Sequence, residues 1–178
     1  MENKERITRA SRTLRRTCTL LVFLVPVICA LYWIFFNQIR HLPNMVDVPV
    51  PITGDLPAFS RLLAFFTDLI SLSVLIYGLQ VLARLFRLYE NGIIFAKANV
   101  DCFNRLGRAM IIWMGCHFLS NSLISIVVTL HHPPGQRMIT VGLEGSDFGA
   151  LFVGGIVLTV TWVMDEARKI KEDQEMFI

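Results

Sequence analysis

The sequence predicts an all-α membrane protein in which four transmembrane helices form a single domain over residues 1–178. Of its 178 residues, 54% are hydrophobic and 17% are charged, whereas a soluble domain carries about 25% charged residues. Four apolar segments are long enough, or nearly so, to cross a hydrocarbon core of about 30 Å at about 1.5 Å per residue. None of them alternates apolar and polar residues as barrel strands do, so a four-helix bundle is favoured.

The four predicted spans differ in length and polarity. The first, residues 17–36, has twenty residues without a formal charge. The second and third, residues 62–82 and 109–130, each contain polar or ionisable side chains. The fourth, residues 148–164, is the shortest at seventeen residues. All four are expected to contact the lipid bilayer, which is the first partner that the composition predicts.

The distribution of basic residues predicts how the chain is threaded. Fourteen of the 17 Lys and Arg residues lie in the N-terminal segment, the loop between the second and third spans, and the C-terminal tail. The other two loops hold Arg40, Arg61 and Arg137 only. Because cytoplasmic loops carry the excess of Lys and Arg, both termini are expected in the cytoplasm. An even number of spans agrees with this orientation.

The two outer loops differ from the spans in composition. The first is rich in proline, and its residues 45–52 have an extended character. Residues 137–145 of the second contain β-branched residues in partial alternation. These two pieces could pair as a small extended cap on the outer face. Pro49 and Pro51 would confine such a strand to an edge, because proline donates no backbone hydrogen bond.

The cytoplasmic loop is the most patterned polar part of the chain. Residues 83–90 are expected to continue the second helix, and Asn91-Gly92 is a helix-stop signal. Residues 95–107 then predict a short amphipathic helix at the inner interface. This helix acts either as an elbow that sets the angle of the third span or as a docking surface for a partner. The candidate docking residues on it are Phe95, Asn99, Phe103 and Arg105.

The C-terminal tail, residues 165–178, holds five acidic and three basic residues. It is expected to extend the fourth helix beyond the membrane. One interpretation is a solvated helix with a frayed end. The other is a docking handle for a cytoplasmic partner, with Gln174 and Glu175 as candidate contact residues.

Two segments, LYENGIIFAKANVDCFNRLGRAM and ARKIKEDQEMFI, carry a family resemblance. The first resembles the G-x-x-F-x-x-x-N-V-x-x-x-x-x-x-G pattern of a widespread family of bacterial inner-membrane proteins of unknown function. The second resembles the ending of that family. The resemblance implies four transmembrane helices in a bacterial inner membrane and frequent encoding beside small helix-turn-helix regulators, and it supplies no activity. The matching positions are Gly92, Phe95, Asn99, Val100, Gly107, Asp173, Gln174 and Glu175.

Asp68 is the most unusual residue of the predicted spans. A carboxylate at mid-membrane costs about 2.5–3.5 kcal/mol on insertion scales, so a compensating partner is expected. Asp68 is expected about 9 Å from the outer edge of the membrane, and Asn121 about 12 Å from it. His117 lies one helical turn deeper than Asn121. Asp68 is therefore expected to bond to the stripe formed by His117, Asn121 and Ser125. This cluster is either a hydrogen-bonded network that fixes helix packing or a functional polar site whose protonation can switch.

Small residues on two spans predict close helix approach. Ala150 and Gly154 form one such pair, and Thr67, Ser71 and Gly78 lie on a stripe of the second span. Contacts of this kind can form within the chain or between copies in a homo-oligomer.

The chain contains no G-x-x-x-x-G-K-[ST], no H-E-x-x-H and no C-x-x-C. We therefore expect no enzymatic activity, no cofactor and no metal site, and the modest net charge of +3 predicts no direct nucleic-acid binding. The leading hypothesis is a small inner-membrane protein with a regulatory, scaffold or partner-sequestering role. Its elbow and tail would bind a cytoplasmic regulator or a membrane-protein partner. The alternative is a small transporter or channel subunit with a polar site at Asp68, His117 and Asn121.

Overall fold

The computed structural model describes residues 2–39, 54–94, 96–130, 139–142 and 145–175. Four long helices make up most of this part of the chain, and no strand occurs in it. The helices are α1 (Glu2–Ile34), the short α2 (Phe36–Ile39), α3 (Ala58–Glu90), α4 (Lys97–Thr129) and α5 (Gly145–Glu175). All except α2 are long and apolar enough to cross a membrane, which confirms the predicted all-α class and the four spans.

The long helices extend well beyond the predicted spans. Three of them have 33 residues and α5 has 31, so they are about 46–50 Å long against a hydrocarbon core of about 30 Å. The predicted short amphipathic helix is the beginning of α4, which starts at Lys97 and runs directly into the third span.

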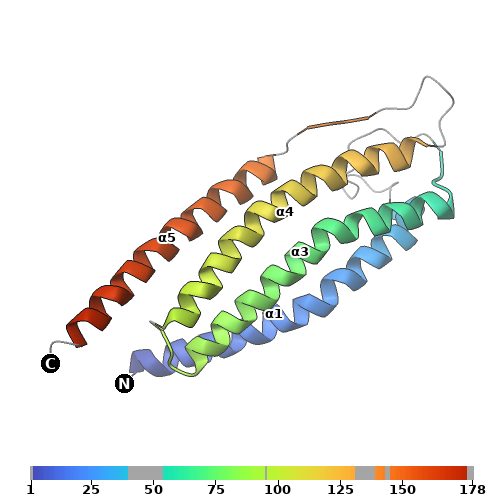
Figure 1. Ribbon diagram of the computed structural model, residues 1–178. Coiled ribbons are helices and arrows are strands. Elements are labelled where there is room, and N and C mark those ends of the chain that lie inside the picture. The colour runs from blue at the N-terminus through green and yellow to red at the C-terminus, as the bar shows by residue number, and fades with distance from the viewer. Residues whose placement is uncertain (1, 40–53, 95, 131–138, 143–144, 176–178) are drawn as a thin grey trace.

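The four long helices lie in a row that follows their order in the chain (Figure 1). Extensive contacts join α1 to α3, α3 to α4 and α4 to α5, and α1 and α5 lie at opposite edges. Both termini and the α3–α4 turn lie at one end, which we call the terminal end. The opposite end, where α1 and α4 finish and α3 begins, is called the loop end.

The turn between α3 and α4 has the helix stop that the sequence predicts. Gly92 has a φ of +76°, a left-handed conformation that glycine adopts without a Cβ penalty. Its amide donates to the carbonyl of Tyr89 at 3.0 Å, and the amide of Ile93 donates to the carbonyl of Leu88 at 2.9 Å. These two bonds form a Schellman motif, which satisfies the last carbonyls of α3 and turns the chain towards α4.

A compact apolar cluster holds the loop end together. Its buried members come from α1, α2, α3 and α4 and from the residues before α3: Trp33, Phe36, Leu56, Ala64, Ile124 and Val128. Asn37 of α2 fixes the chain that leads into α3. Its side-chain amide donates to the carbonyl of Leu56 at 3.1 Å and accepts from the amide of Leu56 at 3.0 Å.

Two glycines allow α4 and α5 to approach closely near the terminal end. A Cβ added to Gly107 would lie 2.7 Å from Cγ of Leu158 and 3.2 Å from the carbonyl oxygen of Gly154. A Cβ added to Gly154 would lie 3.3 Å from the carbonyl oxygen of Gly107. The small residue predicted at Gly154 therefore serves packing within the chain, whereas Gly155 has nothing within 4 Å of such a Cβ.

Helix α5 begins well short of the loop end. Asp147, in its first turn, lies beside His117, and α4 continues from there to Thr129, about 18 Å further. The stagger is visible in Figure 1. Residues 139–142 run along α4, where the amide of Thr140 donates to Oγ of Ser125 at 3.1 Å. They form no strand, and residues 45–52, the other half of the predicted extended cap, lie outside the described residues.

Candidate functional site

Asp68 lies on α3 about 10 Å from Arg61 along the helix axis, near the loop end. Its Oδ2 accepts a hydrogen bond from Nε1 of Trp33 on α1 at 2.6 Å. Trp33 is only 3% exposed. The indole ring thus provides the compensating donor that a carboxylate at this depth requires, and the bond joins α1 to α3.

His117 of α4 forms the matching connection to α5. Its Nδ1 lies 2.9 Å from Oδ1 of Asp147, and the Asp147 side chain is only 1% exposed. The imidazole ring also stacks on Trp113, with ring centroids 4.9 Å apart and an interplanar angle of 20°. Asp147 lies in the first turn of α5, where the helix dipole favours a negative charge.

A third contact completes a row of polar interactions across the four helices. Oγ of Ser120 on α4 donates to the carbonyl oxygen of Thr67 on α3 at 3.2 Å. We call this set, Trp33, Asp68, Ser120, His117 and Asp147, the polar row. It connects α1 to α3, α3 to α4 and α4 to α5 at one level of the membrane.

The sequence predicted some members of the polar row but assigned them different partners. Asp68 was expected to bond to His117 and Asn121, whereas its carboxylate accepts from Trp33 and His117 pairs with Asp147. Asn121 is half-buried one helical turn from His117, towards the loop end. The position of Trp33 could have predicted this bond. Its indole lies in the last turn of the first predicted span, which places an N–H donor near the depth of Asp68.

The polar row contains three titratable side chains. Two are carboxyl groups and one is an imidazole, and each of the three changes its charge when it binds a proton. The non-helical residues 139–142 contact α4 at Ser125, about 12 Å from His117 along the helix. Within the described ranges, no group of three or more His, Cys, Asp or Glu residues could hold a metal ion.

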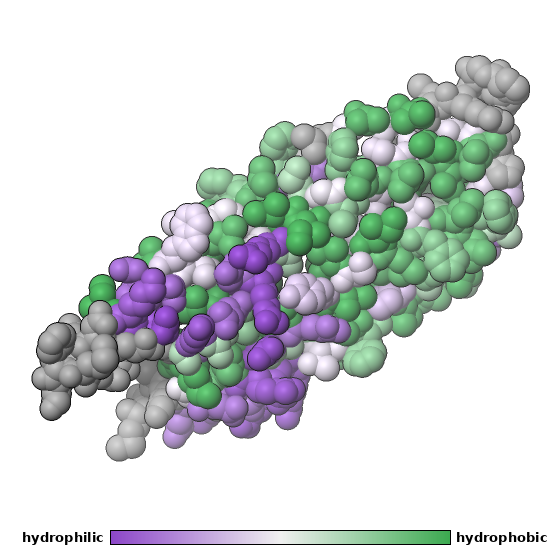
Figure 2. All heavy atoms as spheres, in the orientation of Figure 1, coloured by the Kyte–Doolittle hydropathy of each residue, from purple (hydrophilic) through white to green (hydrophobic). Residues whose placement is uncertain are grey.

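The terminal end has a different electrostatic character. Figure 2 shows hydrophilic residues gathered towards this end, while hydrophobic residues cover most of the remaining visible face. Glu90, the last residue of α3, accepts a hydrogen bond from Nε of Arg12 at 2.9 Å and forms an ion pair with Arg15, whose Nε also lies at 2.9 Å. A carboxylate is unfavourable at a helix C-terminus, so these two cations of α1 offset the helix dipole as well as the charge.

The candidate docking residues at the start of α4 fall into different environments. Asn99 is fully buried, and its Nδ2 donates to the carbonyl of Ile93 at 3.0 Å, so it holds the α3–α4 turn. Phe103 is half-buried and packs on a cluster that includes Leu85. Arg105 is exposed, and Phe95 lies outside the described residues. The predicted division into a buried and an exposed face is confirmed, and it leaves Arg105 as the accessible member.

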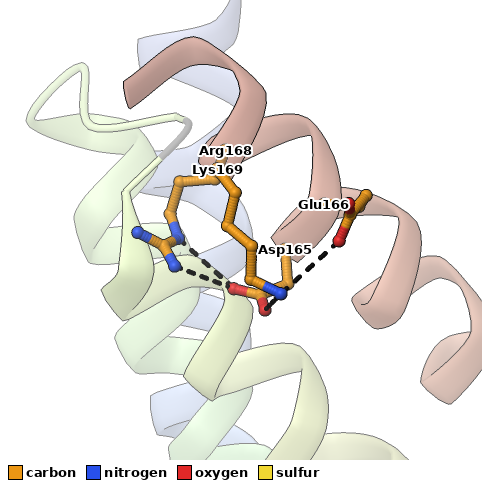
Figure 3. A network of polar contacts seen from close by, with 4 residues as sticks. All are labelled: Asp165, Glu166, Arg168 and Lys169. Atoms are coloured by element: carbon orange, nitrogen blue, oxygen red, sulfur yellow. Dashed lines mark hydrogen bonds and ion pairs between the residues drawn. The ribbon is translucent and has the colours of Figure 1, made fainter. Parts of the chain in front are cut away.

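The tail continues α5 to Glu175, as a helical extension of the fourth span. Figure 3 shows four of its charged residues, in which Asp165 accepts from Arg168 at 3.1 Å and from Lys169 at 3.2 Å. Lys169 also lies 3.4 Å from Glu166. The last described turn contains Gln174 and Glu175, whose side chains lie outside the described part.

Comparison with curated proteins and with solved structures found no match. A family model described as "Protein of unknown function (DUF2975)" matches residues 33–178. The match begins at Trp33 and so covers every residue of the polar row, the α3–α4 turn and the tail. It confirms the expected membership in an uncharacterised family. The chain therefore belongs to the DUF2975 family of proteins of unknown function.

Proposed function

We propose that this multi-pass membrane protein has a regulatory or scaffold role and holds a partner at its terminal end. The observation that carries the proposal is the gathering of hydrophilic residues at that end (Figure 2), many of which are exposed and charged. Exposed basic residues come from three helices there: Arg9 and Arg16 of α1, Arg84 and Arg87 of α3, Arg105 and Arg108 of α4.

The geometry of the helices suits a docking platform. Because α3, α4 and α5 are longer than a bilayer core, the turns of each helix nearest the terminal end project beyond it. The buried face around Asn99, Cys102 and Gly107 fixes the start of α4 against its neighbours. The charged face is therefore presented on a rigid element and needs little ordering when a partner binds.

The proposal includes an orientation and a location. The excess of Lys and Arg at the terminal end supports a cytoplasmic position for both termini. The sequence resemblance supports a bacterial inner membrane. The partner is then a cytoplasmic regulator or the cytoplasmic part of another membrane protein, with an acidic surface that complements the exposed arginines.

Affinity purification from native membranes in mild detergent tests the docking role. A tagged wild-type chain is compared with a chain that lacks residues 165–178 and with an Arg105→Glu/Arg108→Glu variant. Gln38→Glu, an exposed substitution at the loop end, is the matched control. We expect a stoichiometric partner with wild type and control that is reduced in the other two. Equal recovery from all four chains would contradict the proposal.

A second candidate function is a transporter or channel subunit, and the polar row is the specific observation that favours it. Non-helical backbone at membrane depth is tolerated where protein buries it or where it lines a hydrated cavity. Residues 139–142 are non-helical and lie beside α4, where Thr140 bonds to Ser125, and we propose that they line such a cavity. A single row of helices encloses no path, so transport would require several copies of the chain.

Proton flux into proteoliposomes that contain a pH-sensitive dye tests this candidate. Asp68→Asn and Asp147→Asn should both reduce the flux, because each removes a proton-binding group from the polar row. Asp101→Asn, at an exposed position of α4 outside the polar row, should leave it unchanged. Flux that is absent in wild type, or equal in all variants, would exclude transport of protons through this site.

A further inference from the structure

A groove between α1 and α3 opens at the loop end. Its cavity volume is about 340 Å³, which is within the range of pockets that hold small molecules. Its wall is apolar apart from one cation, Arg61. The other lining residues are Ala30, Trp33, Ile34, Ala58, Leu62 and Phe65.

Arg61 has more donors than the protein satisfies. Its Nη1 donates to the carbonyl oxygen of Ile34 at 2.7 Å, where it caps the C-terminus of α1. A guanidinium carries five N–H donors, and no carboxylate pairs with this one in the described part of the chain. The groove therefore contains one positive charge that is not neutralised by an acidic side chain.

The arrangement of the lining residues is that of an amphiphile-binding site. Arg61 lies at the mouth, near the first residue of α3. Phe65 lies one turn, about 6 Å, deeper on α3. Ala30 lies the same distance deeper than Ile34 on the antiparallel α1. Polar contact is thus available at the surface of the bilayer, and only apolar contact is available below it.

We propose that this groove binds one phospholipid of the leaflet at the loop end, with its phosphate on Arg61 and an acyl chain between Ala30 and Phe65. A phosphate oxygen supplies the acceptor that the guanidinium lacks, and guanidinium–phosphate bonds are among the stronger hydrogen bonds in proteins. The apolar wall of the groove shields the acyl chain from water. Free phosphate could bind Arg61 but would leave this apolar part of the groove empty.

The fluorescence of Trp33, which lines the groove, tests the proposal. Trp113→Phe and Trp162→Phe are introduced first, so that Trp33 is the remaining tryptophan. The purified chain in detergent is then titrated with phosphatidylglycerol that carries brominated acyl chains, a contact quencher. We expect saturable quenching that is not displaced by inorganic phosphate. Brominated diacylglycerol, which has no phosphate, should quench at about tenfold higher concentration or above.

Two variants in this background separate the site from general lipid contact. Arg61→Gln should shift the titration to about tenfold higher concentration, and Arg61→Lys should shift it less. Ala30→Phe fills the groove, leaves the Arg61 cap intact and should abolish the saturable component. Equal, unsaturable quenching in all variants would overturn the proposal in favour of bulk lipid contact. If brominated lipid fails to quench Trp33, and the chain forms a dimer that Ala30→Phe dissociates, the groove would instead bind a second copy of the chain.

Discussion

In the half of the molecule towards the loop end, the helices are joined by hydrogen bonds between buried side chains, whereas towards the terminal end they are joined by close backbone approach and exposed ion pairs. Trp33 and Asp147, in the first of these halves, are 3% and 1% exposed. The side chain of Arg12, which binds Glu90 at the terminal end, is 51% exposed. The polar contacts in the two halves therefore have similar lengths, 2.6–2.9 Å, but the first are buried within the bilayer and the second are exposed to water.

The difference in surroundings explains why the same protein uses buried hydrogen bonds in one half and close packing with exposed ion pairs in the other. Lipid offers no replacement partner, so a polar group inside the bilayer must find its partner in the protein. At the terminal end, water solvates any charge that loses its partner, and exposed ion pairs contribute little to stability. Packing of α4 on α5 provides the attachment between this end and the polar row, where Gly107 and Gly154 allow close approach. Substitutions at the two ends should consequently differ in size and in their response to salt.

Replacement of Gly107 should have the largest effect. Gly107→Leu places a side chain where even a Cβ would lie 2.7 Å from Leu158 and 3.2 Å from a backbone oxygen of α5. We expect a loss of about 3 kcal/mol in the free energy of unfolding, because overpacking forces the helices apart. Reversible unfolding in mixed micelles measures the loss. Gly155→Leu, with open space around its Cβ, is the control, and equal losses would refute the close contact.

The His117–Asp147 pair should rank second. Asp147→Ala removes the carboxylate from a histidine that lies in the membrane, and we expect a loss of about 2 kcal/mol. A double-mutant cycle with His117→Ala isolates the pair, and its coupling free energy should be about 1 kcal/mol. Strictly additive losses would show that the 2.9 Å contact does not join α4 to α5 in solution.

The Trp33–Asp68 bond should rank third. Trp33→Phe removes the indole N–H but keeps an aromatic ring against Phe36, on which Trp33 stacks with centroids 5.1 Å apart. A loss of about 1 kcal/mol is expected, the size of a polar contact between transmembrane helices. Trp162→Phe, at a position 71% exposed, should lose much less in the same measurement. A matching loss in the control would assign the effect to ring size and not to the hydrogen bond.

The smallest effect is expected for Glu90. Glu90→Gln breaks both ion pairs to Arg12 and Arg15, but the guanidinium groups remain in contact with water. The loss in melting temperature should be the least of the four and should disappear in 1 M salt, which screens exposed charges. The Trp33→Phe loss should persist at that salt concentration. A Glu90→Gln effect that salt leaves unchanged would contradict the assignment of this end to water.

The sequence predicted the fold well because lipid and helical periodicity constrain it strongly. Runs of apolar residues identified the four spans, and the 3.6-residue period separated buried Asn99 and Cys102 from exposed Arg105. Asn91-Gly92 identified the end of α3 through a conformation that only glycine adopts readily. Each of these features depends on local sequence alone.

The partners in the polar row could not be predicted in the same way, because they depend on the relative displacement of helices. The depths predicted for Asp68 and His117 hold only if every span begins at the edge of the membrane. Helix α5 begins about 18 Å from the end of α4, which brings Asp147 from a predicted loop position to His117. Nothing in residues 131–144 of the sequence encodes that displacement in a recognisable pattern.

The order of the helices in the row has a consequence for biosynthesis. Every extensive helix–helix interface joins neighbours in the chain, so each can close as soon as its second helix has left the ribosome and entered the bilayer. The α1–α3 and α3–α4 interfaces need nothing from α5. Assembly can therefore proceed one hairpin at a time during translation, and α5 docks on α4 after the other interfaces have closed.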